Sequence, residues 1–402
     1  MNKLNKLIIN KKDFIFFLIV YLYSRFIIIS GFIFAEKYLK KSIILGSRYV
    51  VKGYPFARFD SIFYHSIAKN GYGITYDGNI PVHTIVFFPL YPLLTRLFSI
   101  IFFTNIYLSM TIISNISGFL AALFFYKYVR CLTKNMEEGA EIANFALILF
   151  LMAPISIYLN AAYARPILIL FGIISFYMLT KEKVYIAGLF SGLASALNPI
   201  GISVVIGFTA FVLMKFFKKR GSTSIFDVVR LLLLILLSIS GLLIFILYQW
   251  IFFKNPFGFI IFQNSANMLG NSSFISAIIN GLTLKPIFMP NRTIFHFRLN
   301  EVFFGLFLFI LIAAFYKKLL STHILYFLSS LILIDYFFHI AKINYYSASD
   351  RILYLGFPIF FAISLLIQKS RHKDVYLIFS VILFSIMLFY FAAWFYKGYW
   401  ID

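Results

Sequence analysis

Acidic residues are scarce in this sequence, which has only 14 Asp and Glu against 36 Lys and Arg in 402 residues. Charged residues of both signs make up 12% of the chain, about half of what a soluble globular domain carries. The chain has one cysteine, Cys131, which cannot form an internal disulfide. These deficits exclude an ordinary soluble domain and a disulfide scaffold, and the high apolar content excludes a disordered chain.

Apolar residues dominate instead, at 62% of the chain, and the formal net charge is +22. In a soluble protein this basic excess would suggest binding to nucleic acid. Here the lysines and arginines form short clusters between long apolar runs, which is typical of a protein that crosses a membrane many times. The 27 Tyr and 53 Phe are expected to face lipid or the membrane interface. The sequence therefore predicts an all-α polytopic membrane protein with no nucleic-acid partner.

Long apolar runs mark the predicted membrane spans, because about 20 mostly apolar residues cover a hydrocarbon core of about 30 Å. The first run follows a cluster of lysines between Lys3 and Lys12 and has no small-residue cleavage site after it, which favours a retained span over a signal peptide. We expect about 11 transmembrane helices, within Phe14–Phe34, Ile106–Tyr126, Ile142–Leu159, Ile167–Leu179, Val184–Leu197, Gly201–Met214, Leu231–Phe253, Val302–Tyr316, Leu319–Ile340, Ile352–Ile367 and Val375–Tyr396.

The stretch Thr84–Phe103 is long enough to span a membrane but contains two prolines and Arg96. If it crosses, the basic clusters that follow alternate between the two sides. If it lies along the outer interface, every one of those clusters falls in the cytoplasm, which is the arrangement that the positive-inside rule favours. We therefore predict an interfacial helix here, a cytoplasmic N-terminus and a C-terminus on the outer side.

We expect one integral-membrane domain over residues 1–402, with its chemistry on the outer side. Two outer segments are long, residues 35–105 and residues 254–300, whereas the inner loops are short. Functional residues gather in loops that a rigid scaffold positions. Residues 184–214 are predicted as a short helical pair that turns outward at Asn198-Pro199, and such a break is tolerated only beside protein or a watery cavity. The break therefore also points to a site.

A motif in the first outer segment, Arg-Phe-Asp-Ser at residues 58–61, places the carboxylate of Asp60 at the predicted interface. Tyr64 and Ala68 follow at helical spacing, on one face of a helix that lies along the membrane. Asp60 is then placed to act as a general base that takes a proton from an acceptor hydroxyl. The other interpretation is that Asp60 caps the helix that starts near Ser61. The spacing alone leaves both interpretations open.

Residues 58–72 read Arg-Phe-Asp-Ser-x-x-Tyr-x-x-Ile-Ala-x-x-Gly-Tyr, and residues 87–92 read Phe-Phe-Pro-Leu-Tyr-Pro. Together these motifs closely resemble the first luminal loop of PIG-V-type mannosyltransferases, which are the second mannosyltransferase of GPI-anchor synthesis and its prokaryotic relatives within the GT-C superfamily. The family usually has Trp where this chain has Phe59. Weaker agreements follow in the same order along the chain, in Pro154–Tyr163, Asn198–Gly201, Asn255–Gln263 and Asp350–Pro358.

The resemblance implies an all-α GT-C-like fold, with interfacial helices in the first outer loop. It implies transfer of a sugar, typically mannose, from a polyprenyl-phosphate carrier to a lipid, glycan or protein acceptor on the outer face, with inversion. No nucleotide-sugar, metal or other cofactor is expected in this branch. Asp60 matches the acidic residue of the first loop that such enzymes are thought to use catalytically, so the resemblance favours catalysis over capping.

The chain departs from the family pattern at two outer positions. Where the family commonly has Glu after Tyr-Ser or Tyr-Thr, residues 163–166 read Tyr-Ala-Arg-Pro, and where it commonly has Arg, this chain has Asn198. We therefore expect Arg165 to take over the cationic role of the missing Arg. The departures leave the identity of the sugar and of the acceptor open.

Other polar residues on the outer side are candidates for substrate binding, because fixed donors stabilise the negative charge of a departing lipid phosphate. Each has a structural alternative, such as an interfacial anchor or an ordinary surface histidine. The candidates are Arg58, Tyr64, His65, Tyr72, His83, Tyr163, Arg165, Asn198, Asp350 and Arg351. No metal site is expected, because no paired His or Cys ligand spacing occurs.

An inverting membrane glycosyltransferase is the leading interpretation of the sequence. A transporter or flippase of lipid-linked saccharides would share the many spans, and it would carry ionisable residues along a path through them. Few such charges occur here; Asp335 and His339, one turn apart in a predicted span, are functional candidates without an assigned role, or they pair only with each other. A non-catalytic relative that acts as a partner subunit is compatible with the changes at Arg165 and Asn198. The loop carboxylate Asp60 favours the enzyme.

Overall fold

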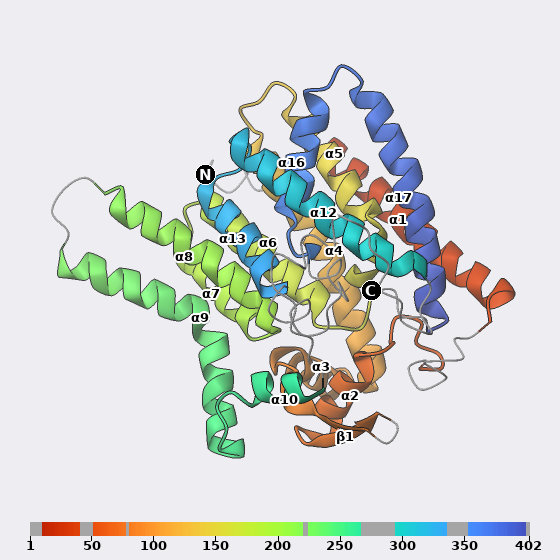
Figure 1. The fold of residues 1–402 in the computed structure, drawn as a ribbon, viewed down its shortest axis with the longest axis vertical. Helices are drawn as coiled ribbons and strands as arrows, with labels where there is room; N and C mark the ends of the chain where they lie inside the picture. The colour runs from red at the N-terminus through yellow and green to blue at the C-terminus, as the bar shows by residue number, and fades with distance from the viewer. Residues whose placement is uncertain are drawn as a thin grey trace.

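The computed structural model of the protein describes residues 10–40, 51–77, 80–219, 224–266, 294–335 and 353–398, and in these the chain is mostly helical (Figure 1). A two-stranded antiparallel hairpin pairs β1 (Ile74–Asp77) with β2 (Ile80–His83). The helices are α1 (Lys11–Tyr38), α2 (Ser61–Asn70), α3 (Leu90–Ile101), α4 (Ile106–Leu132), α5 (Gly139–Met152), α6 (Arg165–Thr180), α7 (Val184–Ser195), α8 (Ile202–Phe217), α9 (Ile225–Phe253), α10 (Gly258–Ala266), α12 (Ile294–Tyr316), α13 (Thr322–Asp335), α16 (Pro358–Gln368) and α17 (Lys373–Tyr396), with 3-10 helices η3 (Thr84–Val86), η4 (Pro154–Leu159) and η5 (Pro199–Gly201).

Five helices are long and apolar enough to cross a membrane: α1, α4, α9, α17 and the segment Pro199–Phe217, which joins η5 to α8. The shorter apolar helices are α3, α5, α6, α7, α13, α16 and the part of α12 that begins at Phe304. Each apolar run that the sequence predicts as a span overlaps one of these helices. The predicted all-α polytopic fold is therefore confirmed, and the chain is an integral membrane protein.

Helix α3 occupies the ambiguous stretch Thr84–Phe103. It has 12 residues, about as many as the apolar helices α7 and α16, so its length alone does not decide between a span and an interfacial helix. It packs beside α2 and against α4, at the end of the bundle where the β1–β2 hairpin and α10 also lie (Figure 1). Its packing beside α2, at the end of the bundle, favours the predicted interfacial position over a membrane span.

The predicted break at Asn198-Pro199 is present, between the end of α7 and the start of η5. The side-chain Oδ1 of Asn198 accepts a hydrogen bond from the backbone N–H of Ile200 at 3.0 Å, which caps the short helix. The backbone N–H of Leu90 donates to the carbonyl of Ala196 at 3.2 Å. Helix α3 therefore begins against this break, and the break lies beside the first outer segment.

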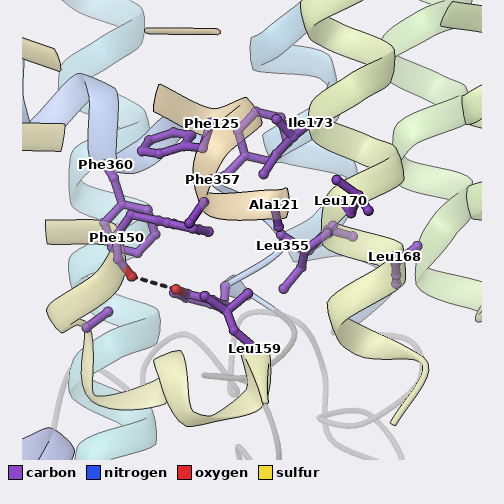
Figure 2. Packing of buried hydrophobic residues seen from close by; sticks show 14 of the residues in the cluster. Ala121, Phe125, Phe150, Leu159, Leu168, Leu170, Ile173, Leu355, Phe357 and Phe360 are labelled. Carbon is purple, nitrogen blue, oxygen red and sulfur yellow. Dashed lines mark hydrogen bonds between the residues drawn. The ribbon is translucent and has the colours of Figure 1, made fainter. Parts of the chain in front are cut away.

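Aromatic rings fill the centre of the bundle, where Phe125 of α4 and Phe150 of α5 lie with centroids 4.6 Å apart (Figure 2). Phe360 of α16 meets Phe150 edge to face at 5.5 Å. Phe150 lies in the last turn of α5, where carbonyls have no partner within the helix. Its carbonyl accepts a hydrogen bond from the hydroxyl of Tyr354 at 2.5 Å. In an apolar surrounding an unsatisfied carbonyl would cost several kcal/mol, so this bond fastens the segment before α16 to α5.

Candidate active site

The loop that precedes α2 is built around the side chain of Arg58, which is only 2% exposed. Its Nη1 donates to the carbonyls of Tyr54 at 2.7 Å and Ala57 at 2.8 Å. Its Nε and Nη2 both donate to the carbonyl of Tyr396, at 3.1 and 3.0 Å. Tyr396 is the last residue of α17, and its ring lies under the guanidinium at 5.4 Å. Arg58 therefore fastens the first outer loop to the end of the last helix.

Burial lowers the pKa of Arg58 to about 10, because desolvation disfavours the charged guanidinium. The side chain is still charged at neutral pH. Its short hydrogen bonds all go to backbone carbonyls of the loop and of α17. This geometry favours a positioning role for Arg58 over the direct substrate contact that the sequence analysis predicted.

The residue before the carboxylate, Phe59, has a left-handed backbone with φ of +42°. This conformation costs a non-glycine residue roughly 1–2 kcal/mol, and such strain persists only where the surroundings hold it, often at functional sites. The Phe59 ring is buried, at 2% exposure, with its centroid 6.1 Å from that of Phe395. The turn therefore buries Phe59 and leaves the next residue, Asp60, partly accessible.

Asp60 stands at the N-cap position of α2, but its side chain makes no capping hydrogen bond. Its backbone is right-handed helical, with φ of −53° and ψ of −20°, whereas a capping residue normally has an extended backbone. The structure therefore shows no side-chain cap by Asp60 on α2. Tyr64 and Ala68, which follow at helical spacing, are both buried on the inner face of α2.

The first outer loop is joined directly to the loop between η4 and α6. The hydroxyl of Ser61 donates to the carbonyl of Ala162 at 3.1 Å. The backbone N–H of Ala162 donates to the carbonyl of Phe56 at 2.9 Å. These bonds bring the segment that carries the carboxylate beside the segment that carries Tyr163 and Arg165, which the sequence analysis placed in separate loops.

Arg165 is the first residue of α6, is partly buried and is followed by Pro166. The N-terminal end of a helix carries a partial positive charge, so a cation there is intrinsically unfavourable and an anion is attracted. Arg165 and the positive end of the α6 dipole therefore form one electropositive position. Tyr163, only 4% exposed, stacks on Tyr158 with centroids 5.7 Å apart. Its buried ring also meets Phe395 of α17 edge to face at 6.5 Å, so the loop before α6 packs against the last helix.

A chain of hydroxyl groups connects α3, α4 and the loop between η4 and α6. The hydroxyls of Tyr91 and Ser114 lie 2.9 Å apart, and Ser114 donates to the carbonyl of Tyr163 at 3.3 Å. Tyr64 meets Tyr91 edge to face at 5.0 Å. Helix α2, with Asp60 at its start, is therefore held through Tyr64 to the same network.

Tyr72 and His83 lie in a different part of the site, against α9 and α10. The hydroxyl of Tyr72 donates to the carbonyl of Phe87 at 2.8 Å, and its ring packs against Phe245 of α9 at 6.0 Å. His83 stacks on Phe262 of α10 at 4.0 Å. The structure therefore divides the predicted site residues into a group around Asp60 and a group on the α9–α10 side.

His65 lies on α2 and stacks on Tyr107, at the start of α4, with centroids 4.1 Å apart. Burial lowers the pKa of His65, and the nearby charge of Lys69 lowers it further. The ring is therefore neutral at pH 7. Asn198 uses its carbonyl oxygen to cap η5, so its structural role is known while its predicted substrate contact stays a prediction.

Two predicted site residues, Asp350 and Arg351, lie outside the described residues, as does His339, the predicted partner of Asp335. Asp335 ends helix α13. Within the described ranges, no group of three or more His, Cys, Asp or Glu side chains could hold a metal ion.

Three contributors to the site were missed by the sequence analysis. The first is Tyr396, whose carbonyl accepts the hydrogen bonds of Arg58. The second is Lys397, which pairs with Glu36 at 2.8 Å and so joins the ends of α1 and α17. Gln249 of α9 accepts a hydrogen bond from the N–H of Phe259 at 3.2 Å, which holds α10 in place. A single amide in the long apolar run of α9 is a signal that could have identified Gln249, whereas a backbone carbonyl leaves no signal in sequence.

The chain is similar to proteins of known type in two comparisons. Residues 47–259 match the model of the family described as Mannosyltransferase (PIG-V). None of the curated proteins matches the chain. An oligosaccharyltransferase from Archaeoglobus fulgidus, solved with zinc and sulfate, is 16% identical with a TM-score of 0.43, over 93% of this chain and 53% of its own.

A second structure is oligosaccharyltransferase AglB from Archaeoglobus fulgidus in complex with an inhibitory peptide and a dolichol-phosphate. It is 14% identical with a TM-score of 0.42, over 94% of this chain and 56% of its own. The chain thus spans about half the length of these solved proteins. The family model covers a little over half of the chain, including both outer loops that meet at Ser61 and Ala162. The protein therefore belongs to the PIG-V mannosyltransferase family.

Proposed function

We propose that the protein transfers a mannosyl residue from a polyprenyl-phosphate carrier to a hydroxyl group of a lipid, glycan or protein acceptor, with inversion, on the outer face of the membrane. Besides the family, one observation carries the proposal. Asp60 follows a strained residue in the first outer loop. Arg58 ties this loop to α17, and Ser61 ties it to the loop between η4 and α6. A carboxylate held this rigidly suits a group that must meet a reacting hydroxyl in a fixed geometry.

In the proposed step, the Asp60 carboxylate takes the proton of the acceptor hydroxyl as that oxygen forms a bond to the anomeric carbon of the sugar. The bond from the anomeric carbon to the phosphate oxygen breaks, and its electron pair leaves with the polyprenyl phosphate. Because the acceptor attacks from the face opposite the leaving group, the configuration of the sugar inverts. The products are the glycosylated acceptor, polyprenyl phosphate and a protonated Asp60, which returns its proton to water.

Arg165 is the cation that we assign to the leaving phosphate. It stands at the N-terminal end of α6, where both its charge and the helix end attract an anion. The loop between η4 and α6, which ends at Arg165, is joined to the Asp60 loop through Ala162, and this contact supports a shared site. Arg165 would thus replace the Arg that the family commonly has where this chain has Asn198.

The role of Arg165 is tested by a charge exchange. Asn198→Arg and Arg165→Glu, each expected to abolish transfer alone, are combined in one protein to restore the family pattern. Recovery of transfer in the double variant is the expected result. Failure to recover, with both proteins folded, would count against the assignment. The contacts proposed for Asp350, Arg351, Tyr64, Tyr72, His65, His83 and Tyr163 remain predictions.

The outer placement of the site is supported by pairs between helix ends. Asp13, at the start of α1, pairs with Arg130, at the end of α4, at 3.0 Å, and both are predicted to be cytoplasmic. Glu36 lies near the C-terminal end of α1, and Lys397 directly follows α17. Both residues are predicted to face outward, and they also pair with each other. Helix ends that the positive-inside rule assigns to one side are therefore in contact with each other.

The proposal is tested in proteoliposomes that contain the purified protein, an acceptor lipid extract and radiolabelled polyprenyl-phosphate mannose or, in parallel, a nucleotide-activated mannose. We expect label to pass to the acceptor from the polyprenyl donor only, with release of one polyprenyl phosphate per sugar. Movement of intact donor across the bilayer without transfer would identify a flippase instead. Neither transfer nor movement, under conditions where the protein is folded, would favour a non-catalytic subunit.

A further inference from the structure

An open groove of about 580 Å³ runs along one face of α8, bounded on the α13 side by Tyr326. Its floor contains Ile206, Ala210 and Phe217, which lie on one helical face, and Lys218 stands at its far end. Tyr326 is 55% exposed and Phe217 is 77% exposed. These large apolar surfaces lie on a membrane helix and are therefore covered by lipid or by another apolar molecule.

The groove begins beside Tyr326 of α13 and continues along α8 past the beginning of α13. The two helices are antiparallel and tightly packed at Gly207, where an added Cβ would lie 2.8 Å from the Cβ of Phe327. One turn further along α8, Phe211 meets His323 with ring centroids 5.0 Å apart. Helix α13 begins at Thr322, so the turns of α8 beyond Phe211 have no part of α13 beside them.

The groove is long enough to hold an apolar chain that reaches from the middle of the bilayer to its surface. From Val205 to Lys218 the helix rises about 20 Å, whereas half of the hydrocarbon core is about 15 Å thick. The positive-inside rule assigns the Lys218 end to the cytoplasmic surface. A molecule that fills the groove therefore has an apolar chain of leaflet length and a head group beside Lys218.

Charge distinguishes Lys218 from its neighbours. Lys215 pairs with Glu182, and Lys219 pairs with Asp227 at 2.6 Å. In the part of the chain that the structure describes, Lys218 has no carboxylate within ion-pair distance. The open end of the groove therefore carries an unneutralised cation at the depth where phospholipid phosphates lie.

We propose that the α8 groove is a binding site for an anionic glycerophospholipid of the cytoplasmic leaflet. One acyl chain lies along α8 against Ala210 and Phe217, and the head-group phosphate pairs with Lys218. The site is separate from the Asp60 loop, so the proposal does not depend on the transfer reaction. Its ligand is a structural or regulatory lipid at the inner end of the bundle, not the sugar donor on the outer face.

The test measures lipid retained by the full-length protein after extraction from nanodiscs that contain equal amounts of phosphatidylglycerol and phosphatidylcholine. Native mass spectrometry counts each bound lipid. Wild type is expected to retain phosphatidylglycerol several-fold over phosphatidylcholine. Lys218→Gln is expected to lower phosphatidylglycerol retention about fivefold, which corresponds to about 1 kcal/mol for one basic residue at a membrane surface. The matched control is Lys369→Gln, at the exposed end of α16.

Two further variants fill the groove. Ala210→Trp and, in case that protein does not fold, Met214→Trp are expected to lower retention of both lipids. The proposal is overturned if wild type retains the two lipids equally, if Lys369→Gln lowers retention as much as Lys218→Gln, or if a folded groove-filling variant retains lipid like wild type. A protein that retains no lipid and is dimeric would overturn it as well and would assign the groove to a second copy of the chain.

Discussion

Replacing Arg58 by Lys tests whether the clamp on the first outer loop positions Asp60. The guanidinium makes four short hydrogen bonds, to the carbonyls of Tyr54, Ala57 and Tyr396, at 2.7 to 3.1 Å. Lysine keeps the charge but replaces a planar fork with three donors on one atom. We expect at least two of the four bonds to be lost. Hydrogen bonds to charged groups contribute about 1.5–3 kcal/mol each, so the docked loop loses about 3 kcal/mol after local relaxation.

Hydrogen exchange measures this loss directly. The N–H of Ala57 donates to the carbonyl of Tyr54, and the N–H of Ser61 donates to that of Arg58. Both amides should exchange about 100-fold faster in Arg58→Lys, because each 1.4 kcal/mol of opening free energy changes the open fraction tenfold. The turnover number of transfer should fall in parallel. Arg371→Lys, in the exposed turn before α17, is the matched control.

Two results would show that Arg58 does not position Asp60. Unchanged protection in Arg58→Lys would mean that the clamp does not hold the loop. Faster exchange in all helices alike would mean that the substitution weakens the whole fold, and that Arg58 has no particular role in positioning Asp60.

Three further predictions concern the surroundings of the site. Ser61→Ala removes the donor to the buried carbonyl of Ala162 and should cost about 1–3 kcal/mol of stability, seen as a lower melting temperature and slower transfer; an unchanged melting temperature would contradict it. Gly118→Ala places a Cβ 2.0 Å from the last carbonyl oxygen of η4 and should lower both stability and transfer, whereas Gly305→Ala, with nothing within 4 Å, should change neither. Because burial lowers the pKa of His65, the unfolded chain binds its proton more readily, so the free energy of unfolding should fall as pH drops below about 6.5. His65→Phe keeps the ring stack and should reduce that slope; an identical slope would show that His65 does not contribute.

The helices and their order followed from the apolar runs, because a membrane requires about 20 apolar residues per span and satisfied backbone groups within it. The break at Asn198-Pro199 was predictable for a related reason, since proline removes a donor and Asn caps the next turn. The short helix α3 was predictable from the distribution of basic clusters. These features depend on local sequence and on the membrane alone.

The function of Arg58 was not predictable in this way. Its chief acceptor is the carbonyl of Tyr396, 338 positions away, and a backbone carbonyl has no residue type that marks it. The left-handed backbone of Phe59 is equally invisible, because tertiary contacts impose it on a residue that disfavours it. The separation of Tyr72 and His83 from the Asp60 group arises from packing against α9 and α10. Only long-range contacts decide which outer residues lie together.

Single-turnover transfer from polyprenyl-phosphate mannose measures whether Asp60 is the general base. The variant Asp60→Asn keeps the size of the side chain and removes its basicity, and Asp77→Asn in the same outer loop is the matched control. We expect Asp60→Asn to slow the transfer step by about 10²–10⁴-fold, with donor binding unchanged, and Asp77→Asn to stay near the wild-type rate. Transfer by a folded Asp60→Asn protein at the wild-type rate would contradict the account.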